Sequence, residues 1–87
     1  VEVLDAAATH DVPVWPHYNW DLHAPLVASI ENGGHVEYFY RERDVKVFDD
    51  VLAEPLSPVD GRIEVPERPG HGVTIDPDRV AQFRVAR

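Results

Sequence analysis

Apolar residues recur at helical spacing at the start of the chain and again before its middle. In VEVLDAAATH the apolar positions share one helical face, which predicts a helix that ends near His10. From about Asp21 to Glu31 an apolar residue recurs every four positions, which predicts a second helix stopped by NGG. Pro25 is compatible with this second helix only in its first turn.

Two short β-rich runs alternate with these helices. VPVW, residues 12–15, has the composition of a strand buried on both faces, and Pro16 ends its pairing. HVEYFY, residues 35–40, is the second run. The order helix, strand, helix, strand with short connections predicts an α/β protein built from parallel β/α units. Two such units cannot close a sheet, so we expect the strands to need neighbours from outside this chain.

The organisation changes near Pro55. VKVFDDVLAEPL, residues 45–56, predicts a short helix or an irregular segment, and turn-forming residues are frequent after it. Asp60-Gly61 predicts a hairpin turn. Asp76 followed by Pro77 predicts the N-cap and first position of a last short helix. We therefore divide the chain into residues 1–55 and 56–87.

The composition argues against some classes of binding partner and indicates a cellular location. The chain has 87 residues, a formal net charge of −8 and no cysteine. That charge argues against binding to nucleic acid or to an anionic membrane surface. No run approaches the ~20 apolar residues of a membrane span, and without cysteines we expect a cytoplasmic protein. Because Val1 lies in the first predicted helix, we also expect the chain to be a fragment or a processed form of a longer protein.

Three motifs resemble the C-terminal end of an enolase superfamily enzyme of the mandelate racemase subgroup. They are PH after a strand, VEYF one β/α unit later, and PERPGHGVTID in the tail. The resemblance implies the last part of a (β/α)7β TIM-like barrel, with residues 12–15 and 35–39 as its seventh and eighth strands. It also implies that residues 56–87 return to an α+β capping domain. His71 departs from the family, which usually has an apolar residue between the two glycines.

The resemblance assigns chemistry to His17 and Glu37. Both follow or lie near the C-terminal end of a predicted strand, where barrel enzymes carry their active sites, and they are 37 − 17 = 20 residues apart. Members of the superfamily remove the proton next to a carboxylate, and they use a Lys or His base together with Mg²⁺. By this resemblance His17 is the base, and Glu37 donates a hydrogen bond to the enediolate oxygen.

The same resemblance implies the partners. The substrate is a small hydroxy or sugar acid, and an acid-sugar dehydratase is favoured over a racemase. The Mg²⁺ ligands are expected outside this chain, on the remaining N-terminal portion of the enzyme, and we expect a homo-oligomer. The chain by itself is expected to be inactive.

Taken alone, each candidate residue also has a structural explanation. A histidine after an X-Pro turn is often only a hydrogen-bonded loop residue, and a glutamate in an apolar strand can discourage edge aggregation. His17 and Glu37 are then structural, in a non-catalytic fragment or a small α+β interaction module. Tyr18 and Trp20 are expected mainly to pack, although their closeness to His17 also makes them candidate walls of a substrate pocket.

Other chemistries match the sequence poorly. His17, His23 and His35 carry imidazoles that bind metals in many proteins, but their spacing matches no familiar zinc motif. We expect His23 in the first turn of the second helix instead, and no metal ligand in this chain. No Ser or Cys nucleophile motif is present, and NGGH is too short for a phosphate-binding loop.

Overall fold

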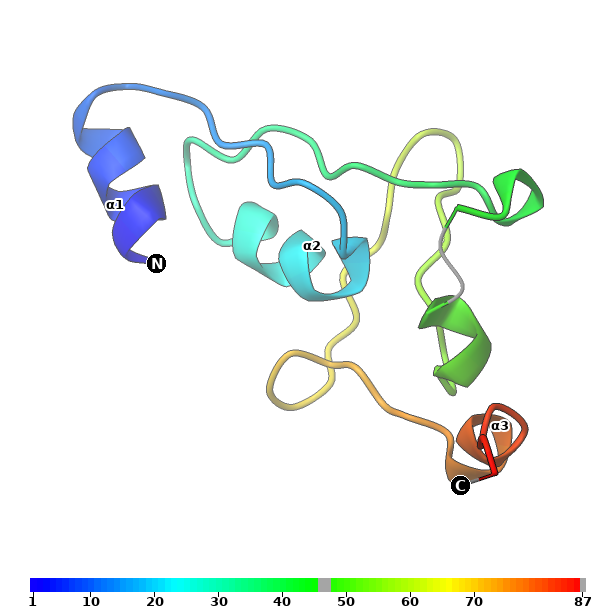
Figure 1. Cartoon of the computed structure of the whole chain (residues 1–87). Coiled ribbons are helices and arrows are strands. Elements are labelled where there is room, and N and C mark those ends of the chain that lie inside the picture. Colours follow the sequence, from blue (N-terminus) through cyan, green and yellow to red (C-terminus); the bar gives the residue numbers. More distant parts are fainter. Residues whose placement is uncertain (46–47, 87) are drawn as a thin grey trace.

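The computed structural model describes residues 1–45 and 48–86, as three α-helices and two 3₁₀ turns joined by extended segments (Figure 1). Lys46 and Val47, in the predicted segment 45–56, lie outside the described residues. The elements are α1 (Glu2–Thr9), α2 (Trp20–Ala28), η1 (Arg41–Arg43), η2 (Phe48–Val51) and α3 (Pro77–Ala81).

Both predicted N-terminal helices are present, but the predicted position of Pro25 within the second helix was wrong. The predicted end of α1 near His10 is confirmed, and α2 begins one residue before the predicted start. Its end comes three residues early, where the Ser29 N–H and Oγ both donate to the Leu26 carbonyl. Pro25 lies in the second turn, not the first. Because proline has no N–H, the helix lacks the bond that residue 25 would donate to the carbonyl of Asp21.

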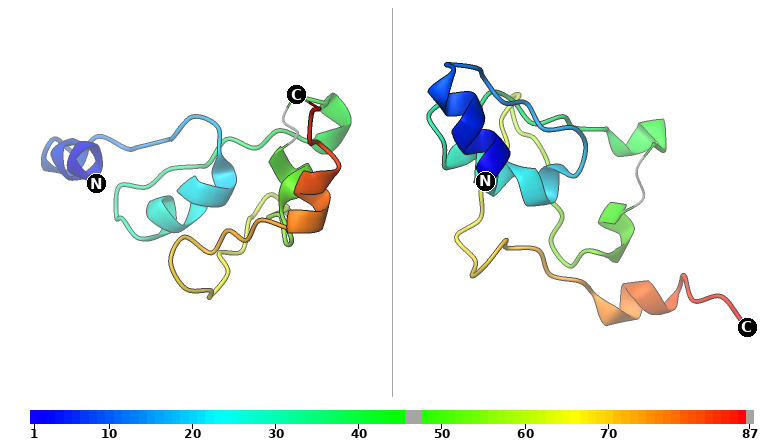
Figure 2. Two further views of the ribbon diagram at one scale, coloured as in Figure 1. Left: turned by 60° about the horizontal axis from the view of Figure 1, so that its bottom comes forward. Right: turned by 60° about the vertical axis from the view of Figure 1, so that its left-hand side comes forward.

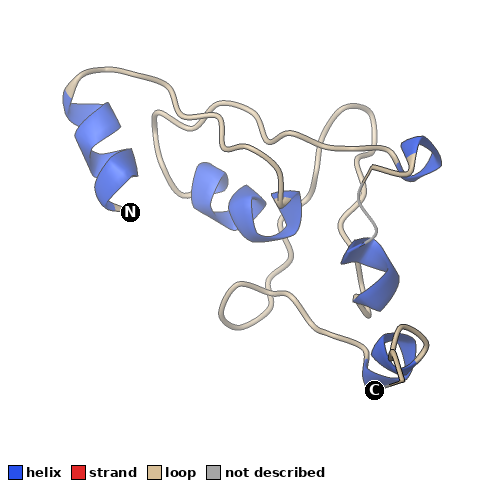
Figure 3. Ribbon diagram, in the orientation of Figure 1, coloured by secondary structure: helices blue, strands red, loops and turns tan. Residues whose placement is uncertain are grey.

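The two predicted strands are extended segments, and in the part of the chain that the structure describes the first pairs only with the residues just before the second. Within the described residues no strand is formed, and Figure 3 shows these segments as loop. Val14 and Gly33 form an isolated parallel bridge, in which the Val14 N–H donates to the Asn32 carbonyl and the Gly34 N–H donates to that of Val14. Pro13 and Pro16 lack N–H donors on either side of this point, which limits the ladder that residues 12–15 can form within this chain.

The tail returns to the segment that precedes it. Leu52 and Ile75 form an antiparallel bridge, the Ala53 N–H donates to Thr74 and the Asp76 N–H donates to Val51. This contact places α3 beside η2, at the end of the molecule opposite α1 (Figure 1). Residues 51–53 and 74–76 therefore close a loop that contains most of the tail.

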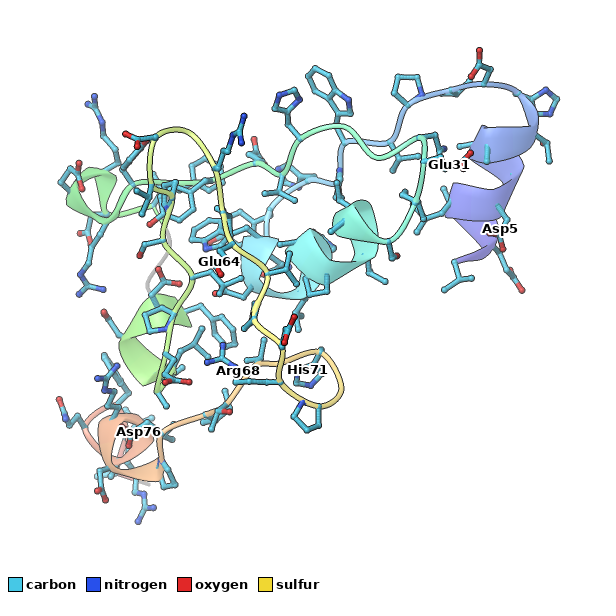
Figure 4. All side chains as sticks on the ribbon, turned by 180° about the vertical axis from the view of Figure 1, so that it is seen from behind. Asp5, Glu31, Glu64, Arg68, His71 and Asp76 are labelled. Carbon is cyan, nitrogen blue, oxygen red and sulfur yellow. The ribbon has the colours of Figure 1, made fainter. Side chains whose placement is uncertain are left out.

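The predicted hairpin turn and the predicted helix N-cap of the tail are both confirmed. Val59 and Arg62 exchange backbone hydrogen bonds across Asp60 and Gly61, whose φ angles of 50° and 74° are those of a two-residue hairpin turn. The Asp76 carboxylate accepts hydrogen bonds from the N–H groups of the second and third residues of α3. Figure 4 shows Asp76 at the start of this helix.

The buried core is small and lies where α2 meets the start of the tail. Among the described residues, Trp20, Ala24 and Leu52 are its buried apolar residues, and the buried carboxylate of Asp21 accepts a hydrogen bond from the Leu56 N–H. The molecule is elongated, with extents of 49 × 26 × 26 Å, and α1 lies apart from the rest (Figure 2). Many apolar side chains consequently remain exposed within this chain.

Two adjacent glycines allow the bridge to form against α2. An added Cβ at Gly33 would overlap the backbone carbonyl of Val27, whereas one at Gly34 would overlap the Trp15 ring. We expect Gly33→Ala to destabilise the protein by about 1–3 kcal/mol, because a helix carbonyl cannot move aside. Gly34→Ala is the matched control and should cost less, since the Trp15 side chain is exposed and can rotate. Urea denaturation measures both, and an equal loss would contradict this account of the bridge.

Candidate active site

His17 and Glu37 lie side by side. Their Nε2 and Oε2 atoms are 3.6 Å apart, within ion-pair distance when the imidazole is protonated. The His17 side chain is 87% exposed and that of Glu37 is 43% exposed, so both are accessible to a small molecule. The structure thus brings together the two residues that sequence reasoning had paired across 20 positions.

The parallel bridge explains this juxtaposition. Val14 pairs with Gly33, an offset of 33 − 14 = 19 residues. In parallel segments the same offset aligns Tyr18 with Glu37, since 37 − 18 = 19. The Tyr18 N–H indeed donates to Glu37 Oε2, at 2.9 Å. The carboxylate is therefore held at the level of the residue that follows His17.

The two oxygens of Glu37 have different surroundings. Oε2 accepts the Tyr18 N–H and is the oxygen nearest to His17. Among the described residues, Oε1 has no hydrogen-bond partner. A proton on this carboxyl is best placed on Oε1, because Oε2 already acts as an acceptor. The site can then present one acidic O–H and one imidazole nitrogen to the same ligand.

Both residues open into a hollow of about 380 Å³. Its lining includes two residues that sequence reasoning missed, Trp15 and His35, whose rings meet edge to face with centroids 4.9 Å apart. The sequence signal that could have identified them is the alternation of side chains along an extended segment, in which residues two apart point to the same side. Trp15 precedes His17 by two positions, and His35 precedes Glu37 by two. The full lining is Trp15, Pro16, His17, His35, Val36 and Glu37.

A larger hollow, of about 580 Å³, adjoins it, sharing His35 and Val36, and is lined by α2 and by residues from 33–40 and 58–65. His17 and Glu37 are absent from its lining, which is mostly apolar. We place the candidate site at the smaller hollow because the acid and the base meet there. The volume of a hollow does not by itself indicate a reactive site.

The two aromatic residues proposed as pocket walls occupy different positions. Trp20 has no exposed surface and packs against Tyr38, with ring centroids 4.5 Å apart. Tyr18 is half-buried, and its ring centroid lies 6.3 Å from that of Trp20 and 5.3 Å from that of Phe39. In this structure neither ring lines the hollow of the candidate site; Trp20 is fully covered, and Tyr18 keeps part of its surface exposed.

His23 lies in the first turn of α2, as predicted. Its Nδ1 is 2.7 Å from the carbonyl oxygen of Tyr18. Within residues 1–45 and 48–86, no three His, Cys, Asp or Glu side chains are grouped so that they could hold a metal ion. The residues of this part of the chain therefore do not fit a magnesium site of their own.

Comparison with known proteins defines the family. A family model described as enolase C-terminal domain-like matches residues 1–79. The chain belongs to this family.

One solved structure extends the comparison to a particular enzyme. It is the L-talarate dehydratase from Polaromonas sp. JS666, solved in complex with Mg and L-glucarate. The two are 28% identical with a TM-score of 0.75, over 92% of this chain and 21% of the dehydratase. Our chain thus spans about a fifth of the length of that enzyme. None of the helices in the described residues is both long and apolar enough to cross a membrane.

The contact between Tyr18 and Glu37 gives a prediction that needs no substrate. Glu37→Ala removes the acceptor of the Tyr18 N–H, whereas Glu37→Gln keeps an oxygen in its place. We expect the Tyr18 amide of the full-length protein to exchange about fivefold faster in Glu37→Ala, the equivalent of about 1 kcal/mol for one hydrogen bond. Hydrogen exchange measures this rate, and Glu31→Ala, an exposed glutamate in the turn after α2, is the control. Unchanged exchange at Tyr18 in Glu37→Ala would show that the contact does not hold the turn.

Proposed function

We propose that the chain supplies two catalytic residues of a Mg²⁺-dependent acid-sugar dehydratase, with His17 as the base and Glu37 as the hydrogen-bond donor to the enediolate oxygen. A racemase acting on a hydroxy acid is the second choice within the same chemistry. The 3.6 Å approach of His17 Nε2 to Glu37 Oε2 in an open hollow carries this proposal. Its substrate class is supported by the similarity to a dehydratase that was solved with L-glucarate.

The chemistry follows from the two side chains. His17 Nε2 takes the proton from the carbon next to the substrate carboxylate, and the electrons of that C–H bond pass into an enediolate. Glu37 Oε1–H donates a hydrogen bond to the oxygen on which negative charge develops. The C–O bond to the β-hydroxyl then breaks, and His17 passes its proton to that oxygen, which leaves as water. The other product is an enol that becomes the keto acid.

In this proposal Mg²⁺ is held by residues outside the chain. The described residues offer no group of ligands for it, so no step of the scheme above is assigned to the metal. A cytoplasmic location and a homo-oligomeric assembly belong to the same proposal and rest on the composition and the family resemblance.

The dimensions of the chain support its role as part of a larger enzyme rather than an independent interaction module. Its radius of gyration is 15.0 Å, whereas a compact domain of this length has one of about 12 Å. Among the described residues, its segments at 12–15 and 35–39 form no bridge with each other, since Val14 pairs with Gly33. Apolar residues such as Val3, Trp15 and Phe83 are largely exposed. We propose that the remaining barrel strands and a capping domain cover these surfaces.

The central prediction concerns His17→Asn in the full-length protein. Asparagine keeps a polar side chain but cannot accept a proton near neutral pH. With L-talarate and L-glucarate as probes in deuterated solvent, we expect turnover and deuterium incorporation at the α-carbon to fall about 10²–10⁴-fold. Mg²⁺ affinity should be unchanged, because no ligand of the ion is placed in this part of the chain.

Two results would contradict the assignment. Wild-type rates of exchange and turnover in His17→Asn would remove His17 from the reaction, and loss of Mg²⁺ binding would make it a ligand or a structural residue. His10→Asn, an exposed histidine at the end of α1, is the matched control and should match wild type. A wild-type protein that exchanges the α-proton of neither acid would overturn the proposed substrate class.

A further inference from the structure

The backbone between His17 and α2 adopts an unfavourable conformation that other groups must maintain. Tyr18 and Asn19 have φ angles of 63° and 42°, in the left-handed region that non-glycine residues seldom occupy. This double turn carries the chain from the extended segment into α2. Any contact that holds it also determines where His17 lies relative to the helix.

Hydrogen bonds hold both polar groups of the Tyr18 backbone. Its N–H donates to Glu37 Oε2 at 2.9 Å, and its carbonyl oxygen lies 2.7 Å from His23 Nδ1. A carbonyl oxygen only accepts hydrogen bonds, so the proton of this contact must be on His23 Nδ1. The imidazole reaches across from α2, where it is half-buried, and does not line the hollow of the candidate site.

A continuous set of contacts therefore connects α2 to the acid and base. It runs from the His23 ring to the Tyr18 backbone, from there to Glu37, and from Glu37 Oε2 to His17 Nε2. Loss of the His23 contact removes one of the side-chain hydrogen bonds that the described residues make to the Tyr18 backbone. The Glu37 carboxylate would then lose the fixed N–H that sets its position.

We propose that His23 is a positioning residue, whose Nδ1–H holds the Tyr18 turn so that Glu37 faces His17. It does not touch the substrate and is not a metal ligand. Its effect on turnover rests on the proposed function, whereas its protonation pattern does not. Histidine suits this role because Nδ1 sits close to the backbone and can donate while the ring packs at the helix start.

The first test reads the tautomer of His23 in the full-length protein without substrate. With ¹⁵N-labelled histidine, the His23 resonances are assigned by their loss in His23→Asn. At pH 9, where an imidazole is ordinarily neutral, we expect a protonated Nδ1 and an unprotonated Nε2. An unprotonated Nδ1 would overturn the proposal. Because no substrate is present, this result stands whether or not the protein acts on a sugar acid.

The second test separates positioning from general stability. His23→Leu removes the donor, whereas His23→Asn places an amide N–H near the position of Nδ1. With L-talarate or L-glucarate, we expect kcat to fall about 10–100-fold in His23→Leu, with KM changed less than about twofold. His23→Asn should recover most of the lost activity. His10→Leu, a histidine remote from the site, is the control.

A double-mutant cycle with Glu37→Ala identifies the route. If His23 acts through the Tyr18 turn on Glu37, His23→Leu should have little further effect on kcat once Glu37 is absent. Equal losses in His23→Leu and His23→Asn, or losses that multiply with Glu37→Ala, would overturn the proposal. Should His23→Leu fail to fold, the tautomer and the activity of His23→Asn decide the matter. An inactive wild type would count against the proposed function only.

Discussion

The register of the parallel pairing between Val14 and Gly33 is the constraint on which the candidate site depends. An offset of 19 residues at the bridge places Glu37 level with Tyr18, and therefore beside His17. A shift of one residue would turn Glu37 to the opposite side of its segment, because successive side chains alternate. Gly33 permits this register, since any Cβ there would overlap a carbonyl of α2.

The sharp left-handed turn after His17 connects this register to the chemistry. It lets a base at the end of an extended segment be followed at once by a helix, whose first turn supplies His23 as a support. The buried ring of Trp20 packs against Tyr38 and lies beside Tyr18. The site is open where His17 projects and packed where Tyr18 is held, which suits a reactive group on a fixed support.

The tail contributes to the same arrangement from the other side of α2. The Leu56 N–H donates to the buried carboxylate of Asp21, and the contact of 51–53 with 74–76 brings the end of the tail back to the same region. The helix that supports the site is therefore tied to the segment following Pro55. The family match over residues 1–79 likewise includes residues on both sides of Pro55.

Local sequence determined the features that depend on near neighbours. The end of α1, the hairpin turn at Asp60-Gly61 and the Asp76 cap were predictable because each rests on conformational preferences within a few residues. The family, and the pairing of His17 with Glu37, also followed from motifs and their spacing. The strands did not, because a ladder needs a paired neighbouring strand, and in the described residues the first predicted strand makes a single bridge, to Gly33 ahead of the second.

Tertiary structure alone decided how the acid and the base are held. The spacing of His17, Tyr18 and His23 in the sequence did not show that the His23 ring would contact the Tyr18 carbonyl. This contact depends on two successive residues in the left-handed conformation. The placement of Trp15 and His35 in the hollow likewise required the register of two segments far apart in sequence. Sequence thus determined which groups are present and their local conformations, and packing decided which of them meet, because long-range contacts depend on register and burial rather than on neighbouring residues.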